Sequence, residues 1–207
     1  DQGIDGGRSL RLAELLRGSL TVRSTIGEGS TFCLRLPQTA EGTRPFRVAD
    51  QEMNHVEASL CFPTFPRFCG QTFTEAKDRE LGLACVKAYN DWMVEEWCGD
   101  SDGQLLPLPI IPLWDAELAA AEVARNAARG ARAVCFSEIP PHLGLPSIHS
   151  GEWDPLFAVC QDTKTVICMH IGSSSRMPAT SGDAPVAVAA TLSFGNAMAS
   201  MSDWLFS

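Results

Sequence analysis

The residue best placed to do chemistry is His170, in the stretch TVICMHIG over residues 165–172. The residues before it are β-branched, apolar or thiol-bearing, and a glycine and three serines follow soon after it. This pattern predicts a buried strand that ends in one polar side chain. In parallel α/β proteins, ligands and catalytic groups collect at that edge of the sheet. Two interpretations are open: His170 takes part in chemistry, or it is a core histidine that caps the strand by bonding the backbone. The second is favoured by the fact that one histidine by itself cannot make a metal site.

Further candidates lie at or after the ends of other predicted strands, and we assign them to substrate binding: Trp114, Glu138, His142 and His149. The two loop histidines would face a substrate carboxylate, or else lie in solvent or bond a backbone carbonyl. Glu138 would orient His170, or else form a surface salt bridge. Trp114 would line an aromatic substrate pocket, or else contribute only to packing.

The elements that must position these residues alternate along the chain. Strands are predicted over residues 56–62, 105–113, 131–139 and 165–171, and helices over 78–98, 116–129, 154–162 and 185–206. Four strand–helix units in series imply a parallel sheet covered by helices. Neither a G-x-G-x-x-G motif nor a Walker loop follows any of these strands. We therefore predict an α/β fold, a partial (β/α)8 barrel, because polar and aromatic groups stand at its strand ends.

The first residues have a different pattern. A helix is predicted over residues 8–17, and alternating strands over 19–25 and 30–36. Together they form a small helix–hairpin α+β remnant. Residues 38–51 are polar and are predicted to be an irregular linker. The predicted domains are therefore residues 1–37, the linker 38–51, and the partial barrel 52–207.

Composition limits the classes of partner. The formal net charge is −9 over 207 residues, which argues against a nucleic-acid or anionic-membrane partner. No apolar run reaches the length of a membrane span. The chain has eight cysteines and no C-x-x-C pair, so we expect free thiols and a cytoplasmic location.

The longer predicted domain resembles the amidohydrolase-related family, in the branch that includes aminocarboxymuconate-semialdehyde decarboxylase. The resemblance rests on ASLCFPT (58–64), AYNDW (88–92), PLPIIPL (107–113), GARAV (130–134), HSGEWDP (149–155) and MHIG (169–172). It implies a metal-dependent (β/α)8 barrel that acts as a hydrolase or non-oxidative decarboxylase (a lyase) on a small carboxylated substrate. A divalent metal, zinc or manganese, would activate a water or polarise that substrate.

In this family, as the resemblance implies, the metal is held by a His-x-His pair on the first strand, a histidine ending the fifth strand and an aspartate on the last. His170 matches the fifth-strand ligand, so the predicted strands would be strands two to five. His55 has no His-x-His partner nearby. We therefore expect a fragment that is weak or inactive as it stands and does not retain the metal. Homo-oligomers through its open sheet edges are also expected.

A second resemblance covers residues 1–37. The stretches GIDGGRSLRLAELLRGSLTVRS (3–24) and GEGSTFCLRLP (27–37) are similar to the C-terminal end of a sensor histidine-kinase ATP-binding domain. The alternatives to the enzyme hypothesis are therefore an ATP-binding signalling remnant and a non-functional composite of two gene pieces. No nucleotide-binding residue is assigned.

Overall fold

The computed structural model describes residues 19–25, 29–35 and 43–207 of the chain. The chain divides into two compact units, Asp1–His55 and Val56–Ser207, and each is described by itself. The second unit begins close to residue 52, where the partial barrel was predicted to start. The assignment of three domains stays a prediction.

In the first unit, strands β1 (Ser19–Thr25) and β2 (Gly29–Arg35) pair as an antiparallel hairpin with Leu20 opposite Leu34. Both predicted strands are thereby confirmed, while the helix predicted over 8–17 lies outside the described residues. The prediction of an irregular segment was wrong for residues 43–51, which belong to helix α2 (Thr43–Met53). Pro45 is compatible with that helix because a proline in the first turn removes no intrahelical hydrogen bond.

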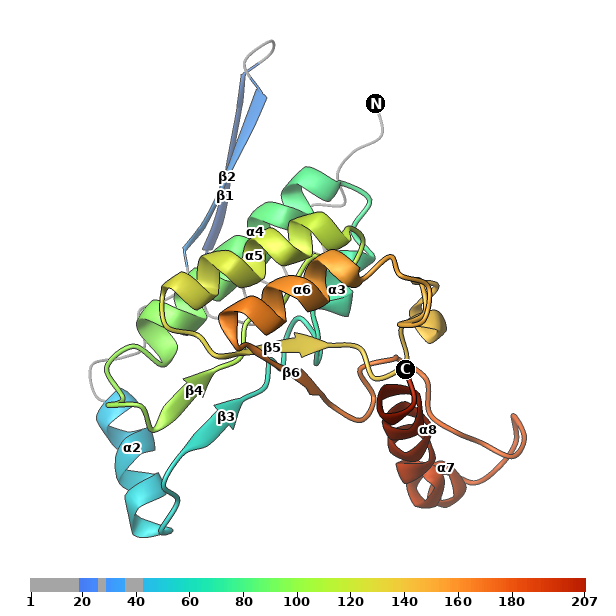
Figure 1. The fold of residues 1–207 in the computed structure, drawn as a ribbon. Coiled ribbons are helices and arrows are strands. Elements are labelled where there is room, and N and C mark those ends of the chain that lie inside the picture. Colours follow the sequence, from blue (N-terminus) through green and yellow to red (C-terminus); the bar gives the residue numbers. More distant parts are fainter. Residues whose placement is uncertain (1–18, 26–28, 36–42) are drawn as a thin grey trace. The chain divides into compact units, whose positions relative to one another are not determined.

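In the second unit, four strands form two parallel pairs, as Figure 1 shows. Strand β3 (Ser59–Cys61) pairs with β4 (Leu105–Pro107), and β5 (Ala133–Phe136) pairs with β6 (Val166–Met169). A backbone hydrogen bond of 2.9 Å from the Cys135 nitrogen to the Pro109 oxygen joins the two pairs. The prediction of four strands with parallel pairing is confirmed.

The strands are shorter than predicted, and β4 shows why. It ends at Pro107, although the apolar run continues to Leu113. Proline has no N–H to donate to a neighbouring strand, and Pro109 and Pro112 follow. The side chain of Asn90 takes over the pairing beyond them: its amide nitrogen donates to the Ile110 oxygen at 2.8 Å and its oxygen accepts from the Ile110 nitrogen at 2.9 Å.

The helices of the second unit are α3 (Gln71–Thr74), α4 (Arg79–Asp91), the π-helix η1 (Trp92–Trp97), α5 (Ala116–Ala128), the 3-10 helix η2 (Pro140–Leu143), α6 (Asp154–Thr163), α7 (Val186–Leu192) and α8 (Phe194–Leu205). The aspartate before α5 caps it as predicted, because the Asp115 carboxylate accepts from the Leu118 nitrogen at 2.9 Å. None of the described helices has the length and apolar character needed to cross a membrane.

Two predicted helices are interrupted. The helix predicted over 78–98 changes to π geometry after Asp91, and the Cys98 nitrogen bonds the Met93 oxygen five residues earlier at 3.1 Å. The helix predicted over 185–206 breaks at Ser193, whose hydroxyl donates to the Ala190 oxygen at 2.8 Å. Such a bond from a serine side chain competes with the helix ladder. Helices α7 and α8 are therefore separate.

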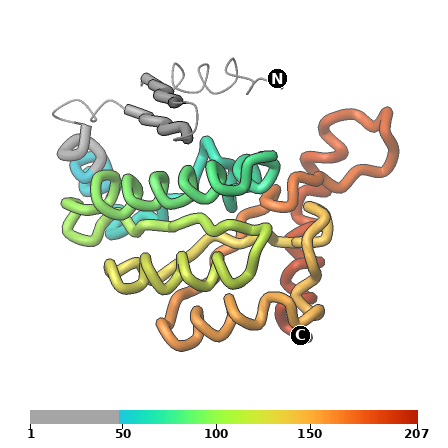
Figure 2. The backbone as a smooth tube through the Cα atoms, turned by 90° about the horizontal axis from the view of Figure 1, so that it is seen from above, coloured from blue at the N-terminus to red at the C-terminus, as the bar shows by residue number. Residues whose placement is uncertain are grey.

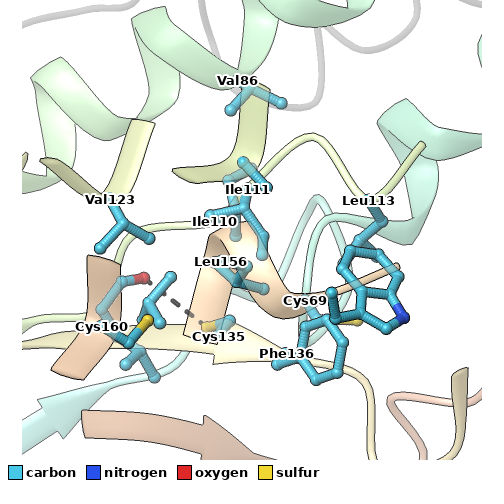
Figure 3. Close-up of a cluster of buried hydrophobic side chains, with 14 of the residues drawn as sticks. Cys69, Val86, Ile110, Ile111, Leu113, Val123, Cys135, Phe136, Leu156 and Cys160 are labelled. Atoms are coloured by element: carbon cyan, nitrogen blue, oxygen red, sulfur yellow. Dashed lines mark hydrogen bonds between the residues drawn. The ribbon is translucent and has the colours of Figure 1, made fainter. Parts of the chain in front are cut away.

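The core lies between the strands and helices α4, α5 and α6, which run roughly parallel to one another in Figure 2. Figure 3 shows Val86, Ile110, Val123, Phe136 and Leu156 converging there. Every second residue of a strand faces the same side. On β4, Leu105 is buried whereas Leu106 is exposed, so the helices cover one face of this strand. The residues that position the site lie where these strands end.

Candidate active site at the strand ends

Three loops meet at the C-terminal ends of the strands. Phe62 follows β3, Glu138 follows β5 and His170 follows β6. The rings of Phe62 and His170 lie edge to face with their centroids 5.0 Å apart. The carboxylate of Glu138 reaches the backbone of Gly172, at 2.9 Å. The candidates Glu138 and His170 thus lie close together with Phe62 at the C-terminal ends of β5, β6 and β3.

The imidazole of His170 is held between two aromatic rings. Phe68 stacks on it, with 3.8 Å between centroids and an interplanar angle of 8°, and Phe62 contacts it edge to face. Its Nδ1 lies 2.6 Å from the Ile171 carbonyl oxygen. A carbonyl oxygen only accepts, so Nδ1 carries the proton and, in the neutral ring, Nε2 carries the free lone pair. His170 therefore bonds the backbone through Nδ1, as a structural histidine does, and still has a lone pair on Nε2 that can bind a ligand.

The turn after His170 depends on its glycine. Gly172 has φ of +89°, and a Cβ there would lie 3.5 Å from the Phe68 ring. The Ser173 nitrogen closes the turn by donating to the His170 oxygen at 2.9 Å. A side chain at this position would strain the backbone. Glycine is therefore required by the left-handed backbone of this turn, whereas a Cβ would make only an ordinary contact with the Phe68 ring.

Glu138 is buried and organises this turn. Its Oε1 accepts from the Gly172 nitrogen at 2.9 Å, from the Ser174 hydroxyl at 2.8 Å and, at 3.4 Å, from the Ser174 nitrogen and the Asn196 amide. In return, the Glu138 nitrogen donates to the Ser173 hydroxyl at 2.8 Å. Its Oε2 has no hydrogen-bond partner among the described residues. Of the two interpretations offered for Glu138, a surface salt bridge was wrong, because the side chain is buried among polar groups of the turn.

Gln71 joins the loop after β3 to the same turn. Its amide nitrogen donates to the Ser173 oxygen at 2.8 Å, and its oxygen accepts from the Cys69 nitrogen at 2.9 Å. Gln71 and Asn196 were not among the predicted site residues. Both are polar residues that become buried only because distant segments meet, so no local pattern in the sequence distinguishes them from surface residues.

The Cys69 thiol lies beside this turn. Burial raises the pKa of the Cys69 thiol well above its usual range; the Arg67 guanidinium acts in the opposite direction but does not offset burial. Its sulfur lies 3.5 Å from the Ser173 oxygen. Because the thiolate is the reactive form of cysteine, this neutral thiol is inert at ordinary pH. The seven cysteines of the second unit form no disulfide with one another in the described part of the chain.

The other residues predicted to bind substrate are Trp114, His142 and His149, and they make different contacts. Trp114 packs under the guanidinium of Arg79, 5.0 Å from its ring centroid. His142 lies in η2 with a buried Nδ1 that has no partner within the described part of the chain. His149 is exposed, and its Nε2 lies 3.6 Å from the Asp203 carboxylate of α8. A role in substrate binding stays a prediction for these residues and for Glu138.

The described residues do not by themselves provide the three ligands of a catalytic metal site. Among residues 19–25, 29–35 and 43–207, no three histidine, cysteine, aspartate or glutamate side chains are grouped to hold one ion. A catalytic zinc usually has three protein ligands and one open position. His170 presents one imidazole.

A sequence model of the amidohydrolase family matches residues 37–203. The chain belongs to the amidohydrolase family. Among solved structures, it is similar to an amidohydrolase from Mycobacterium avium subsp. paratuberculosis K-10, with a TM-score of 0.54 and 28% identity. The match covers 70% of this chain and 38% of that one. No curated protein matches.

Membership in the amidohydrolase family supports a TIM-barrel-type α/β fold. These matches do not test the resemblance to the branch that includes aminocarboxymuconate-semialdehyde decarboxylase, which stays a prediction. The kinase-like resemblance stays a prediction: the family match begins at residue 37, and most of the kinase-like stretch over residues 3–24 lies outside the described residues. The comparisons do not favour the signalling or composite alternatives.

Proposed function

We propose that this amidohydrolase chain contributes His170 as one ligand of a divalent-metal site, zinc or manganese, in a hydrolase or non-oxidative decarboxylase. The observation that carries the proposal is the contact between His170 Nδ1 and the Ile171 oxygen. Metal-binding histidines usually donate their second ring N–H to a carbonyl or carboxylate, which fixes the ring and leaves the other nitrogen for the metal. His170 has that arrangement at the strand edge where such sites form.

We further propose that the chain corresponds to strands two to five of the barrel and is weak or inactive by itself. This rests on the single imidazole and on the 38% coverage of the longer Mycobacterium amidohydrolase. Further ligands would then come from groups other than the described residues. Because the aromatic rings of Phe62 and Phe68 cover two sides of His170, they would exclude water from the imidazole and keep its orientation fixed.

The substrate class we propose is a small carboxylated molecule. Arg67 precedes the ring that stacks on His170, and its guanidinium lies 3.3 Å from the Ser175 hydroxyl just beyond the turn. Guanidinium groups bind carboxylates with two parallel hydrogen bonds. Arg67 also forms an ion pair with Glu75, so a substrate carboxylate would compete with that residue.

A zinc titration followed by NMR of the imidazole nitrogens tests the proposed ligand. In the parent chain we expect His170 to carry its proton on Nδ1, and Nε2 to be the nitrogen that shifts when zinc is added. We expect weak zinc binding, because a single imidazole is one ligand where a zinc site usually has at least three. His170→Ala should lower the zinc affinity by about tenfold or more.

The matched control is His149→Ala, which removes an exposed imidazole paired with Asp203. It should leave zinc binding unchanged. A proton on Nε2 of His170, or equal zinc affinity in the parent chain and His170→Ala, would contradict the proposal.

A further inference from the structure

Two non-glycine residues with left-handed backbone contact one another beside the turn that follows His170. Arg67, in the loop after β3, has φ of +60°, and Ser175, in the turn after β6, has φ of +57°. A guanidinium nitrogen of Arg67 lies 3.3 Å from the Ser175 hydroxyl oxygen. Left-handed backbone is unfavourable for residues with a Cβ, and residues held in it gather at active sites and ligand clamps. Ser175 is exposed and Arg67 is partly exposed, so a solute can reach this pair.

The neighbours of these two residues hold them next to the candidate site. Phe68 follows Arg67 in the chain, and its ring stacks on His170. The Ser175 nitrogen donates to the Gly172 oxygen at 3.0 Å, within the turn after His170. The pair is therefore attached on one side to the ring that covers the histidine and on the other side to the turn that follows it.

The hydrogen-bond chemistry of the pair suits a carboxylate. A guanidinium only donates, so the Ser175 hydroxyl accepts from Arg67 and keeps its own proton to donate to another group. The guanidinium and the hydroxyl together offer donors to both oxygens of a carboxylate. The net charge of −9 opposes anion binding over the chain as a whole, so an anion needs a local cation of this kind.

Glu75 already places a carboxylate on this guanidinium. Its Oε1 forms an ion pair with Nη2 of Arg67, whereas Nη1 is the nitrogen near Ser175. The Glu75 side chain is 65% exposed, so solvent weakens the ion pair and a carboxylate from solution can displace it. Glu75 lies eight residues from Arg67 in the same chain, which gives it a high effective concentration at the guanidinium.

We propose that Arg67 and Ser175 bind the substrate carboxylate together, and that Glu75 is an internal competitor that sets the affinity for it. This inference rests on the carboxylated substrate class proposed above and adds to it a second donor and a competitor. Binding exchanges one carboxylate for another on Arg67. Glu75 therefore discriminates against molecules that bind through a carboxylate alone, because they gain little from the exchange.

Titration of the full chain with sodium acetate is the test, with sodium chloride keeping the ionic strength constant. The readout is the NMR signal of the Arg67 Nε–H group, identified by its absence in Arg67→Lys. Glu75→Gln should raise the acetate affinity by about threefold, because the competitor loses its charge. Ser175→Gly should lower it by about fivefold, because one donor is lost while glycine keeps the left-handed backbone.

The matched control is Glu80→Gln, which removes the same charge from an exposed carboxylate in the first turn of α4. It should leave the acetate affinity at the value of the parent chain. If Glu80→Gln raises the affinity as much as Glu75→Gln does, the gain comes from net charge alone and Glu75 is not the competitor.

The outcomes separate this inference from the proposed function. Equal acetate affinities in the parent chain, Glu75→Gln and Ser175→Gly would overturn the inference and leave carboxylate binding at Arg67 in place. An Arg67 signal that acetate shifts in neither the parent chain nor Glu75→Gln would overturn the proposed substrate class as well. A shift seen only in Glu75→Gln supports the inference. The zinc titration of His170 is independent of all these results.

Discussion

The Oε1 atom of Glu138 accepts a hydrogen bond from the Gly172 nitrogen at 2.9 Å, which ties the end of β5 to the turn that follows His170. Glu138→Ala should lower the free energy of unfolding by about 2 kcal/mol, because buried backbone and amide donors lose their acceptor. Glu138→Gln keeps a carbonyl oxygen for those donors and should lose less. Urea unfolding of the two variants measures the difference.

The same two variants test whether Glu138 positions the His170 ring or only stabilises the fold. Glu138→Ala should also shift the imidazole resonances of His170, because the turn that orients the ring is released, whereas Glu138→Gln should leave them close to those of the parent chain. Unchanged His170 resonances in a folded Glu138→Ala chain would show that Glu138 does not position the histidine.

Asn90 should be one of the costliest residues to replace. It is fully buried and makes both hydrogen bonds to the Ile110 backbone, together with a bond of 2.7 Å to Glu122. Asn90→Ala should destabilise the chain by about 3 kcal/mol, because several buried groups lose partners at once. Urea unfolding measures this. The exposed Asn54→Ala is the control and should change stability by about 0.5 kcal/mol or less.

The ion pairs of Asp91 predict a pH dependence. Burial acts to raise the pKa of Asp91, but hydrogen bonds and charges from Arg125 and Arg129 outweigh it and hold the pKa below 3.8. The ionised carboxylate therefore contributes stability above pH 3.8, and this contribution is lost as pH falls through the lower folded-state pKa. Asp91 is partly exposed, so the contribution should be about 1 kcal/mol or less. The stability gap between parent and Asp91→Asn should shrink below pH 3.8.

A buried thiol predicts the alkaline behaviour. Burial raises the pKa of Cys160 from 9.0 to about 11. The unfolded chain releases this proton first, so the stability contribution is complete below pH 9.0 and is lost as pH rises toward about 11. Over that pH range, the free energy of unfolding should fall less steeply with pH in Cys160→Ala than in the parent chain. The two slopes should differ by at most about 1.4 kcal/mol per pH unit. Equal slopes in parent and variant would contradict this.

Local patterns were sufficient to predict the strands and most helix ends. The apolar run before His170 predicted strand β6, and Asp115 predicted the start of α5, because a short apolar run and a capping hydrogen bond depend on residues close together in the chain. The burial predicted for this strand was wrong, because Val166 is 60% exposed and the other three residues of β6 are only partly buried. The break at Ser193 and the π geometry after Asp91 were missed. Each is accompanied by a hydrogen bond that departs from the α-helical ladder, from the Cys98 nitrogen to the Met93 oxygen and from the Ser193 hydroxyl to the Ala190 oxygen.

By itself, the sequence determined that the second unit is built from alternating strands and helices and that His170 ends a strand, because both are set by short-range periodicity. Only the tertiary structure decided which side chains surround it. The pairs Glu138–Gly172 and Gln71–Ser173 join residues 34 and 102 positions apart, so these hydrogen bonds exist only once the strands are placed side by side. The same holds for α8: its periodicity is local, but which of its sides faces solvent is fixed by the distant partners of Asn196 and Trp204.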